Sequence, residues 1–310
     1  MKGFMDRLDA MSVLLAVVQE GSLSAGARRL RAPLATVSRK VQDLEQHLGT
    51  RLLVRTSRRV ELTDAGRGYV AASQRILEQV DEAERAAAGE FREPRGELAV
   101  TAPVVFGRRH LLPIAVKFLS EYPKIDLRLQ LSDRHVNLIE EHLDVGIRLG
   151  HLEDSSLMAT RVGQVRRLIC ASPDYLARRG TPVSPDDLKD HDGITFRGFS
   201  VSPEWRYRGD NPLLSVEPYP RLAVNSIEAA VDAAVAGLGI ARVLSYQIVD
   251  ELRSGALVPL LEEFAPEPIP VQLVYASQGQ IPVKIRAFLD WAAPRLRDRL
   301  TRLLIAGVPR

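Results

Sequence analysis

The feature that most constrains this chain is a pair of short helical segments within residues 22–48, joined by a tight turn. The second segment carries apolar residues three or four positions apart, at Leu34, Val37, Val41, Leu44 and Leu48. These side chains share one face of an α-helix, which indicates packing on a small core. The first segment, residues 23–30, follows Ser22, a favourable N-cap. With a further helix over residues 6–19, the pair predicts a helix-turn-helix, whose second helix enters the major groove of DNA.

Positive charge is concentrated at this helix pair. Residues 22–59 contain nine Arg and Lys against two acids, whereas residues 60–95 contain five basic and eight acidic residues. The whole chain has a net charge of only +3, so the excess of positive charge is local. Binding to DNA phosphates requires a local basic surface of this kind. The alternative interpretation is a solvated basic face on a small helical bundle.

Two short strands, residues 52–54 and 60–62, are expected to follow the helix pair and to form a wing. Its candidate contacts to phosphates or the minor groove are Arg55, Arg58 and Arg59. Four residues of the second helix are candidates for contacts to bases or backbone: Thr36, Ser38, Arg39 and Lys40. Arg39 points away from the apolar stripe and is the first choice for a guanine contact. Lys40 is equally suited to anchoring a phosphate.

A long segment without proline begins at Thr63, another favourable N-cap, and predicts one helix to about residue 90. Apolar and small side chains recur every seven residues along it in two series, Tyr69, Ile76 and Ala83, and Ser73, Val80 and Ala87. A narrow seam of this period is typical of a helix that a second copy covers. Residues 63–92 are therefore expected to form a dimerisation helix. The alternative is a surface helix packed on its own neighbours.

The remainder of the chain, after a break at residues 93–96, alternates apolar strands with helices and indicates an α/β domain. Strands are expected at 98–102, 125–132, 145–149, 167–171, 240–243 and 269–276. Helices are expected at 109–122, 136–143, 227–236, 246–253 and 283–303. Joints at residues 163–165 and 265–270 suggest that the chain crosses twice between two lobes, which can bind a ligand in their cleft. The predicted domains are 1–62 (winged helix-turn-helix), 63–92 (linker helix) and 96–310, with lobes at 96–164 plus 268–303 and at 165–267.

Several stretches together resemble the LysR-type transcriptional regulators: GSLSAGARRL (21–30), TVSRKVQDLEQHLGTRLLVR (36–55), LTDAG (62–66), GELAVTAP (96–103), FLSEYPKIDLRLQLSD (118–133), LDVGIRLG (143–150), CASPDYLARRGTP (170–182) and AGLGIARV (236–243). The resemblance implies a winged helix-turn-helix, a long linker helix and a two-lobed effector domain like a periplasmic binding protein. It also implies a homodimer or homotetramer that binds double-stranded DNA at dyad-like sites. A small-molecule effector, often a carboxylate, is expected in the cleft between the lobes.

The sequence departs from the family pattern at the start of the second helix. Pro33 and Leu34 stand where members often carry Ser and Gln, and Leu34 cannot make the bidentate adenine contact that Gln makes. Base reading is then expected to shift toward Thr36, Ser38 and Arg39, with Leu34 or Ala35 near thymine methyl groups. Gly26 also stands where Ala is usual, at a cost of roughly 1 kcal/mol in helix propensity.

The same resemblance points to effector contacts at strand ends and helix starts: Thr101, Ala102, Pro103 and Ser132 in the first lobe, and Phe199 and Asn225 in the second. Free N–H groups at helix starts suit a carboxylate. Arg148 could add positive charge to the cleft. The alternative for Arg148 is a structural ion pair with a nearby acid.

Other function classes find little support in the sequence. It contains no G-x-S-x-G, H-E-x-x-H, P-loop or G-x-G-x-x-G motif, and its six His residues show no metal-binding spacing, so neither enzyme activity nor a cofactor is expected. Cys170 is expected to be a small buried hydrophobe. The apolar run at 10–18 imitates a secretory signal, but Asp6 and Asp9 precede it. With no membrane-spanning run, we expect a cytoplasmic protein. The rival hypothesis is a two-lobed receptor or enzyme without sequence-specific DNA binding.

Overall fold

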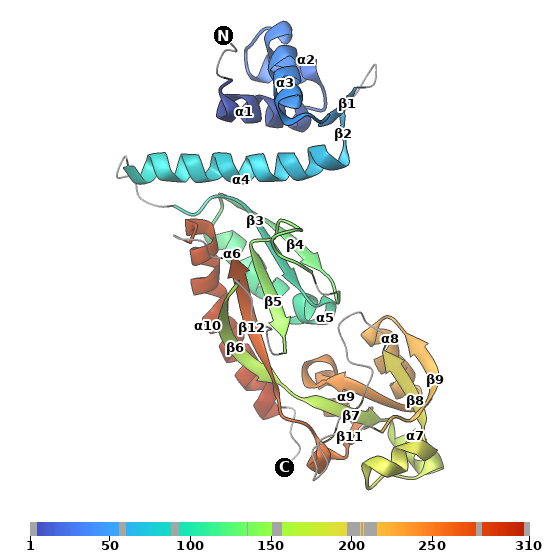
Figure 1. Ribbon diagram of the computed structural model, residues 1–310. Helices are drawn as coiled ribbons and strands as arrows, with labels where there is room; N and C mark the ends of the chain where they lie inside the picture. Colours follow the sequence, from blue (N-terminus) through green and yellow to red (C-terminus); the bar gives the residue numbers. More distant parts are fainter. Residues whose placement is uncertain are drawn as a thin grey trace. The chain divides into compact units, whose positions relative to one another are not determined.

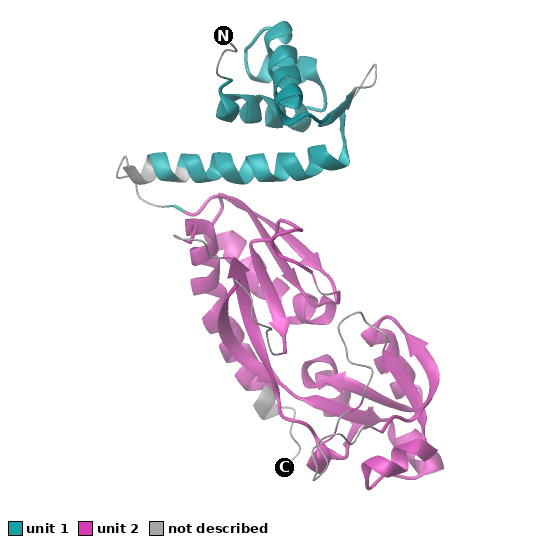
Figure 2. Ribbon diagram, in the orientation of Figure 1, with its two compact units in different colours: residues 1–93 teal, residues 94–310 magenta. Residues whose placement is uncertain are grey.

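The computed structural model describes residues 5–55, 60–87, 93–134, 136–150, 157–196, 205, 207, 216–276 and 281–306. The chain divides into two compact units, Met1–Glu93 and Pro94–Arg310 (Figure 2), and each unit is described by itself. No single described helix is long and apolar enough to cross a membrane; one bent pair, α1 with α2, passes the same test by length and composition alone.

The first unit is the expected helix-turn-helix with a two-stranded wing (Figure 1). Its elements are α1 (Arg7–Gln19), α2 (Leu23–Arg29), α3 (Leu34–Leu48), β1 (Leu53–Arg55), β2 (Val60–Leu62) and α4 (Asp64–Ala87). The side chains of Asp6 and Ser22 cap α1 and α2. One core joins α1, α2, α3 and the start of β1 through Leu14, Val17, Ala27, Val41 and Leu53.

The apolar stripe of α3 is buried in its middle and exposed at its ends. Val37, Val41 and Leu44 are fully buried, which confirms that this face packs on the core. Leu34 is 48% exposed and Leu48 is 36% exposed, so the two ends of the stripe are only partly covered. Leu34 is thereby available at the N-terminal end of α3.

The N-terminal part of α4 packs on its own unit, contrary to the expectation that this helix does not face its own core. Tyr69 and Val70 pack against the first unit's core, and Ser73, one turn after Tyr69, is fully buried. Further along the helix, Ile76 is 38% exposed and Val80 is half-buried. Ala83 is exposed, and the Ala87 side chain lies outside the described residues. The part of the seam left open to a second copy therefore starts at about Ile76.

The second unit contains two five-stranded sheets, which define two lobes (Figure 1). The first-lobe sheet, in spatial order, consists of β4 (Ile125–Leu131), β3 (Gly96–Ala102), β5 (Val145–Leu149), β12 (Ile269–Ala276) and β6 (Leu157–Val165). The second-lobe sheet consists of β11 (Val258–Leu260), β7 (Arg167–Ala171), β10 (Ile240–Leu244), β8 (Asp192–Phe196) and β9 (Tyr219–Val224). The chain passes between the lobes at Arg166, directly after β6, and again between β11 and β12. The predicted joint at 163–165 lies within β6.

Helices cover these sheets on defined faces. In the first lobe, β3 is followed by a continuous helical stretch made of α5 (Val104–Phe106), a π-helical turn (Gly107–Leu111) and α6 (Leu112–Glu121), and α10 (Val283–Ala306) packs along β6. In the second lobe, α8 (Ile227–Val235) packs on β8 and β10. Shorter helices complete this lobe: α7 (Pro173–Arg179), 3₁₀ turns at Pro185–Asp190, Ser245–Gln247 and Glu262–Phe264, and α9 (Val249–Ser254).

One predicted helix is absent from the described chain. Residues 136–143 form turns instead of a helix, and His142 has a φ of +55°. Val136, Leu138 and Leu143 are nevertheless buried, because they cover the face of the first-lobe sheet that carries Ala99 and Val274. The apolar spacing therefore predicted the buried residues correctly, but it predicted a helix where the chain forms turns. Strands β6, β8, β9 and β11 were not predicted.

Candidate DNA-binding and effector sites

The N-terminal half of α3 presents the residues that the sequence assigns to base reading. Leu34, Ala35 and Arg39 are exposed, and Thr36 and Ser38 are half-buried beside them. Within the described part of the chain, Arg39 makes no hydrogen bond or ion pair. Its planar guanidinium therefore keeps all five N–H donors available to a base edge or phosphate. This placement is what a recognition helix requires.

Lys40 differs from Arg39 because it already has a partner. Its ammonium group forms an ion pair with the carboxylate of Asp9 in α1. The pair is partly exposed, so its net contribution to stability is small. A phosphate would compete with Asp9 for this ammonium, which makes Lys40 the weaker of the two candidates.

The wing is held to the helices by hydrogen bonds that the sequence analysis missed. Glu45 of α3 accepts hydrogen bonds through Oε1 from the amides of Leu52 (2.8 Å) and Leu53 (3.0 Å). The amide of Val60 donates to the carbonyl of Gly21 at 3.1 Å. In the sequence, Glu45 is one of only two acids in the basic segment 22–59. An acid in such a segment was the one sequence feature that could have pointed to this role. The Arg55 side chain, Arg58 and Arg59 lie outside the described residues.

The expected effector site at the end of β3 already contains a carboxylate from the protein. Thr101 and Ala102 are buried, and Pro103 occupies the N-cap position of α5. The amide of Val104, at the start of this helix, donates to Oδ1 of Asp133 at 3.0 Å. The expectation of a free N–H group at this position is therefore wrong for Val104. Asp133 satisfies the donor that a carboxylate ligand would otherwise use.

Ser132 lies beside this junction, as expected. Its amide donates to the Ala102 carbonyl at 3.0 Å, which joins the ends of β3 and β4. Its hydroxyl accepts a hydrogen bond from the Arg134 amide at 3.1 Å. In the second lobe, Asn225 is exposed and precedes Ser226, the N-cap of α8. Phe199 lies outside the described residues.

Arg148 is held inside the first lobe. Its guanidinium donates to the backbone carbonyl of Val136, and it is only half-buried. Burial lowers the pKa of Arg148, while the nearby carboxylate of Glu141 opposes that shift. The hydrogen bond to Val136 favours the structural alternative over a role in the cleft, although its partner is a carbonyl oxygen and not an acid.

The two lobes meet through the helical stretch that follows β3. Arg108 forms an ion pair with Glu228 of α8, and Arg109 Nη1 lies 3.4 Å from Asp250 Oδ2 of α9. The His110 ring packs against the Tyr246 ring, with centroids 5.6 Å apart. His110 Nδ1 accepts a hydrogen bond from Arg299 Nε at 2.8 Å. Burial, with the charge of Arg299, lowers the pKa of His110 to about 4, so this imidazole is neutral near pH 7.

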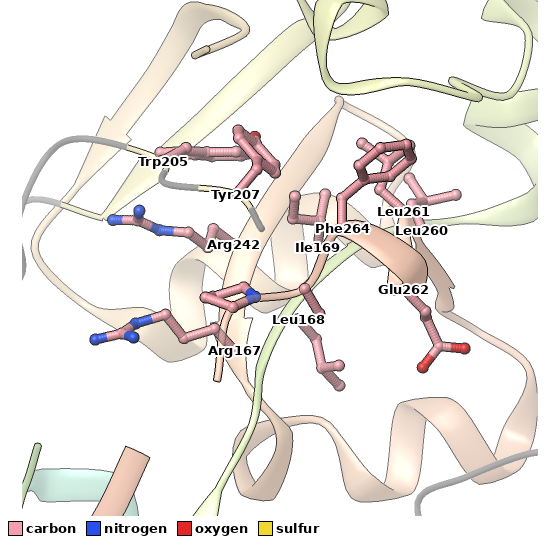
Figure 3. Close-up of a pocket in the computed structure, with 12 residues that line it drawn as sticks. Arg167, Leu168, Ile169, Trp205, Tyr207, Arg242, Leu260, Leu261, Glu262 and Phe264 are labelled. Atoms are coloured by element: carbon pink, nitrogen blue, oxygen red, sulfur yellow. The ribbon is translucent and has the colours of Figure 1, made fainter. Parts of the chain in front are cut away.

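A separate pocket lies in the second lobe, with about 370 Å³ of space that is partly open to solvent (Figure 3). Two arginines, Arg167 and Arg242, and three aromatic side chains, Trp205, Tyr207 and Phe264, line it. Cys170, which lies on the same strand as Arg167, is fully buried, as expected, and burial raises the pKa of its thiol to about 12, so it is unreactive. No group of His, Cys, Asp or Glu suited to a metal ion occurs among the described residues.

Comparison with known protein families identifies both units. Residues 8–67 match the bacterial regulatory helix-turn-helix proteins of the lysR family, and residues 91–297 match the LysR substrate binding domain. The chain belongs to the LysR family. It is a transcriptional regulator that combines a helix-turn-helix DNA-binding domain with an effector-binding domain, as the resemblance implied.

Individual LysR-type relatives match along nearly the whole chain. A helix-turn-helix transcriptional repressor of Pseudomonas aeruginosa (strain UCBPP-PA14) is 35% identical over 289 residues, which are 93% of this chain and 91% of that protein. The transcriptional activator AaeR of Escherichia coli (strain K12) is 32% identical over 289 residues, 92% of this chain and 93% of that protein. The solved structure of CrgA, a LysR-type regulator from Neisseria meningitidis, has a TM-score of 0.60 at 32% identity and covers 93% of this chain and 98% of that one.

Proposed function

We propose that α3 reads base edges chiefly through Arg39, with Thr36 and Ser38 as hydrogen-bonding contacts and Leu34 or Ala35 beside thymine methyl groups. The observation that carries this proposal is the exposed Arg39 guanidinium, which has no side-chain partner among the described residues, on a helix whose opposite face is buried. Arg is the side chain best suited to bidentate recognition of guanine O6 and N7. Lys40 and the wing residues Arg55, Arg58 and Arg59 are assigned to the phosphate backbone.

We further propose that the protein works as a homodimer or homotetramer in the cytoplasm, joined through the exposed part of α4, and that it is not an enzyme.

An effector in the cleft between the lobes would contact the ends of β3 and β4 near Thr101 and Ser132 and the start of α8 near Asn225. Asp133 already occupies the helix start at Val104, which disfavours a carboxylate at that junction. Ion pairs from Arg108 and Arg109 connect the lobes beside it, so a ligand that separates them can change the lobe arrangement.

The experiment that tests base reading compares Arg39→Ala with Lys40→Ala on DNA flanking the gene of this protein. Footprinting first locates the site, and fluorescence anisotropy then measures affinity for each single-base variant across a salt series. Arg39→Ala is expected to cost about 1–3 kcal/mol and to relax specificity at one position. Lys40→Ala is expected to weaken binding equally on all sequences and to reduce the salt slope by about one.

Two outcomes would contradict this assignment. If Arg39→Ala weakens binding to the same extent on every sequence, Arg39 is a phosphate anchor and another residue reads the base. If the parent protein shows no sequence-dependent protection at any salt concentration, α3 does not read bases, and the proposed role of this helix is wrong.

A further inference from the structure

The pocket of the second lobe lies on the face of its sheet that carries Ile169. Side chains alternate along β7, so Leu168 and Cys170 join the large core that continues into the first lobe, while Ile169 faces a separate cluster. In the antiparallel pairing of β7 with β10, Arg242 stands opposite Ile169, and Leu244 stands opposite Arg167. Arg167 and Arg242 therefore project from the same face as Ile169. The pocket is distinct from the cleft between the lobes.

This pocket has an excess of positive charge at one end. Burial lowers the pKa of both Arg167 and Arg242, and the charge of Arg167 contributes to the shift at Arg242. Within the described residues, the side chain of Arg167 makes no hydrogen bond or ion pair. The one acid in the lining, Glu262, pairs with Arg166 at 3.1 Å. Glu217, an exposed residue near Arg242, carries a negative charge that opposes the lowering of the Arg242 pKa.

The other walls of the pocket are aromatic and apolar. Trp205 and Tyr207 are buried, with exposed fractions of 4% and 5%. The Arg242 guanidinium carbon lies 5.5 Å from the centroid of the Trp205 ring. The Tyr207 hydroxyl donates to the Val216 carbonyl at 3.1 Å, which directs its polar end away from a ligand. Figure 3 shows Trp205 and Tyr207 on one side, Phe264 and Leu261 on the other, and both guanidinium groups extending the same way.

We propose that this pocket binds a small aromatic monocarboxylate. The carboxylate pairs with the guanidinium group of Arg167, with Arg242 beside it, since arginine binds carboxylates through paired N–H donors. The ring occupies the space between the two aromatic walls, where apolar burial and ring contacts stabilise it. A cation is disfavoured by the two arginines, and an inorganic anion would leave the apolar walls uncovered. This site is independent of the DNA-reading function and of the effector cleft proposed above.

The location links such a ligand to both segments that connect the lobes. Arg167 directly follows the first crossing, and the pocket residues from Leu261 to Pro266 belong to the second crossing. A ligand that contacts Arg167 at one end and Phe264 at the other touches both segments at once.

The test uses the full chain with Trp291→Phe, which leaves Trp205 as the only tryptophan. Benzoate is titrated and Trp205 fluorescence recorded, with calorimetry on the parent protein as a measurement that does not depend on the reporter. We expect saturable binding that is at least ten-fold weaker for benzamide, the neutral analogue, and for acetate, which lacks the ring. Arg167→Gln is expected to weaken benzoate binding at least ten-fold. The matched control Arg166→Gln removes the neighbouring arginine, which pairs with Glu262, and should leave binding within two-fold of the parent.

The proposal would be overturned by no saturable binding of benzoate, by equal binding of benzamide, or by equal loss in Arg166→Gln and Arg167→Gln. Loss of benzoate binding in Ser132→Ala with retention in Arg167→Gln would place the ligand in the cleft and would also overturn it. Circular dichroism and the thermal midpoint of each variant verify folding. Arg242→Lys provides a second variant if Arg167→Gln does not fold, and it should also weaken benzoate binding. DNA affinity, measured separately on the same samples, distinguishes failure at this pocket from failure of the DNA-reading function.

Discussion

The protonation of the His110 imidazole is controlled by the residues around it. In the unfolded chain its pKa is near 6.5, whereas burial between α6, Tyr246 and Arg299 lowers it to about 4. Protonation would place a third positive charge beside Arg299 and Arg109, where no described acid contacts the ring. Asp250 pairs with Arg109, at 3.4 Å, and not with His110.

This burial predicts that the second unit loses stability in acid. Between about pH 4 and pH 6.5 the unfolded chain binds more protons than the folded chain, so the free energy of unfolding rises with pH across this window. The contribution is complete above pH 6.5 and falls by about 3 kcal/mol as the pH approaches 4. Urea unfolding followed by tryptophan fluorescence measures it, because both tryptophans lie in the second unit.

The matched variant is His110→Asn, whose side-chain oxygen can still accept the hydrogen bond from Arg299 but which does not titrate. It is expected to flatten most of the pH dependence. The pKa of His191 is also lowered by burial, so a smaller slope remains. An unchanged slope in His110→Asn would show that His110 is protonated in the folded protein near pH 5.

At the scale of elements, two glycines of α4 differ in what surrounds them. A Cβ atom on Gly66 would lie 2.0 Å from the carbonyl oxygen of Leu52, which also accepts a hydrogen bond from the Thr63 amide at 3.0 Å. A Cβ atom on Gly68 would meet no atom within 4 Å. Gly66 therefore permits the close approach of α4 to the wing, and Gly68 has no such role.

The variants Gly66→Ala and Gly68→Ala are expected to have opposite effects. Gly66→Ala should destabilise the first unit by about 2–3 kcal/mol, because the carbonyl of Leu52 cannot move without losing its hydrogen bonds. Gly68→Ala should stabilise it by up to about 1 kcal/mol through helix propensity alone. Hydrogen exchange of peptides from α1 to α4 measures both changes within the full chain. Equal protection in the two variants would refute the close-packing argument.

Gly26 illustrates how packing can outweigh propensity. From sequence, Gly26 appears as a loss of about 1 kcal/mol relative to the usual Ala. In the structure, a Cβ atom on Gly26 would lie 2.9 Å from both Cα and Cγ2 of Val17, so the glycine allows α2 to approach α1 closely. Residues 136–143 show a limit of prediction from apolar spacing. The spacing identified the buried side chains correctly, but it could not distinguish a helix from turns.

At the scale of the whole molecule, self-association should depend on the part of α4 beyond its own core. Ile76→Asp is expected to reduce the apparent mass in analytical ultracentrifugation toward the monomer mass of 34.3 kDa, because a buried charge in a helix seam is strongly disfavoured. Gln74→Asp is the control, since it adds the same charge at an exposed position on the opposite side of the helix. If both variants associate like the parent, the dimer interface lies elsewhere.

The sequence by itself determined the features that depend on local periodicity and charge. It established the helix-turn-helix, the capped starts of α2 and α4, the basic excess at residues 22–59 and the alternating α/β pattern, because these are set by residues close together in the chain. Only the tertiary structure decided which groups already have hydrogen-bond or ion-pair partners. The Asp133 carboxylate accepts a hydrogen bond from the amide of Val104, Lys40 forms an ion pair with Asp9, and Arg148 donates to the carbonyl of Val136. The arginine and aromatic pocket of the second lobe likewise draws on segments some 100 residues apart in sequence, from Arg167 to Phe264, which only folding brings together.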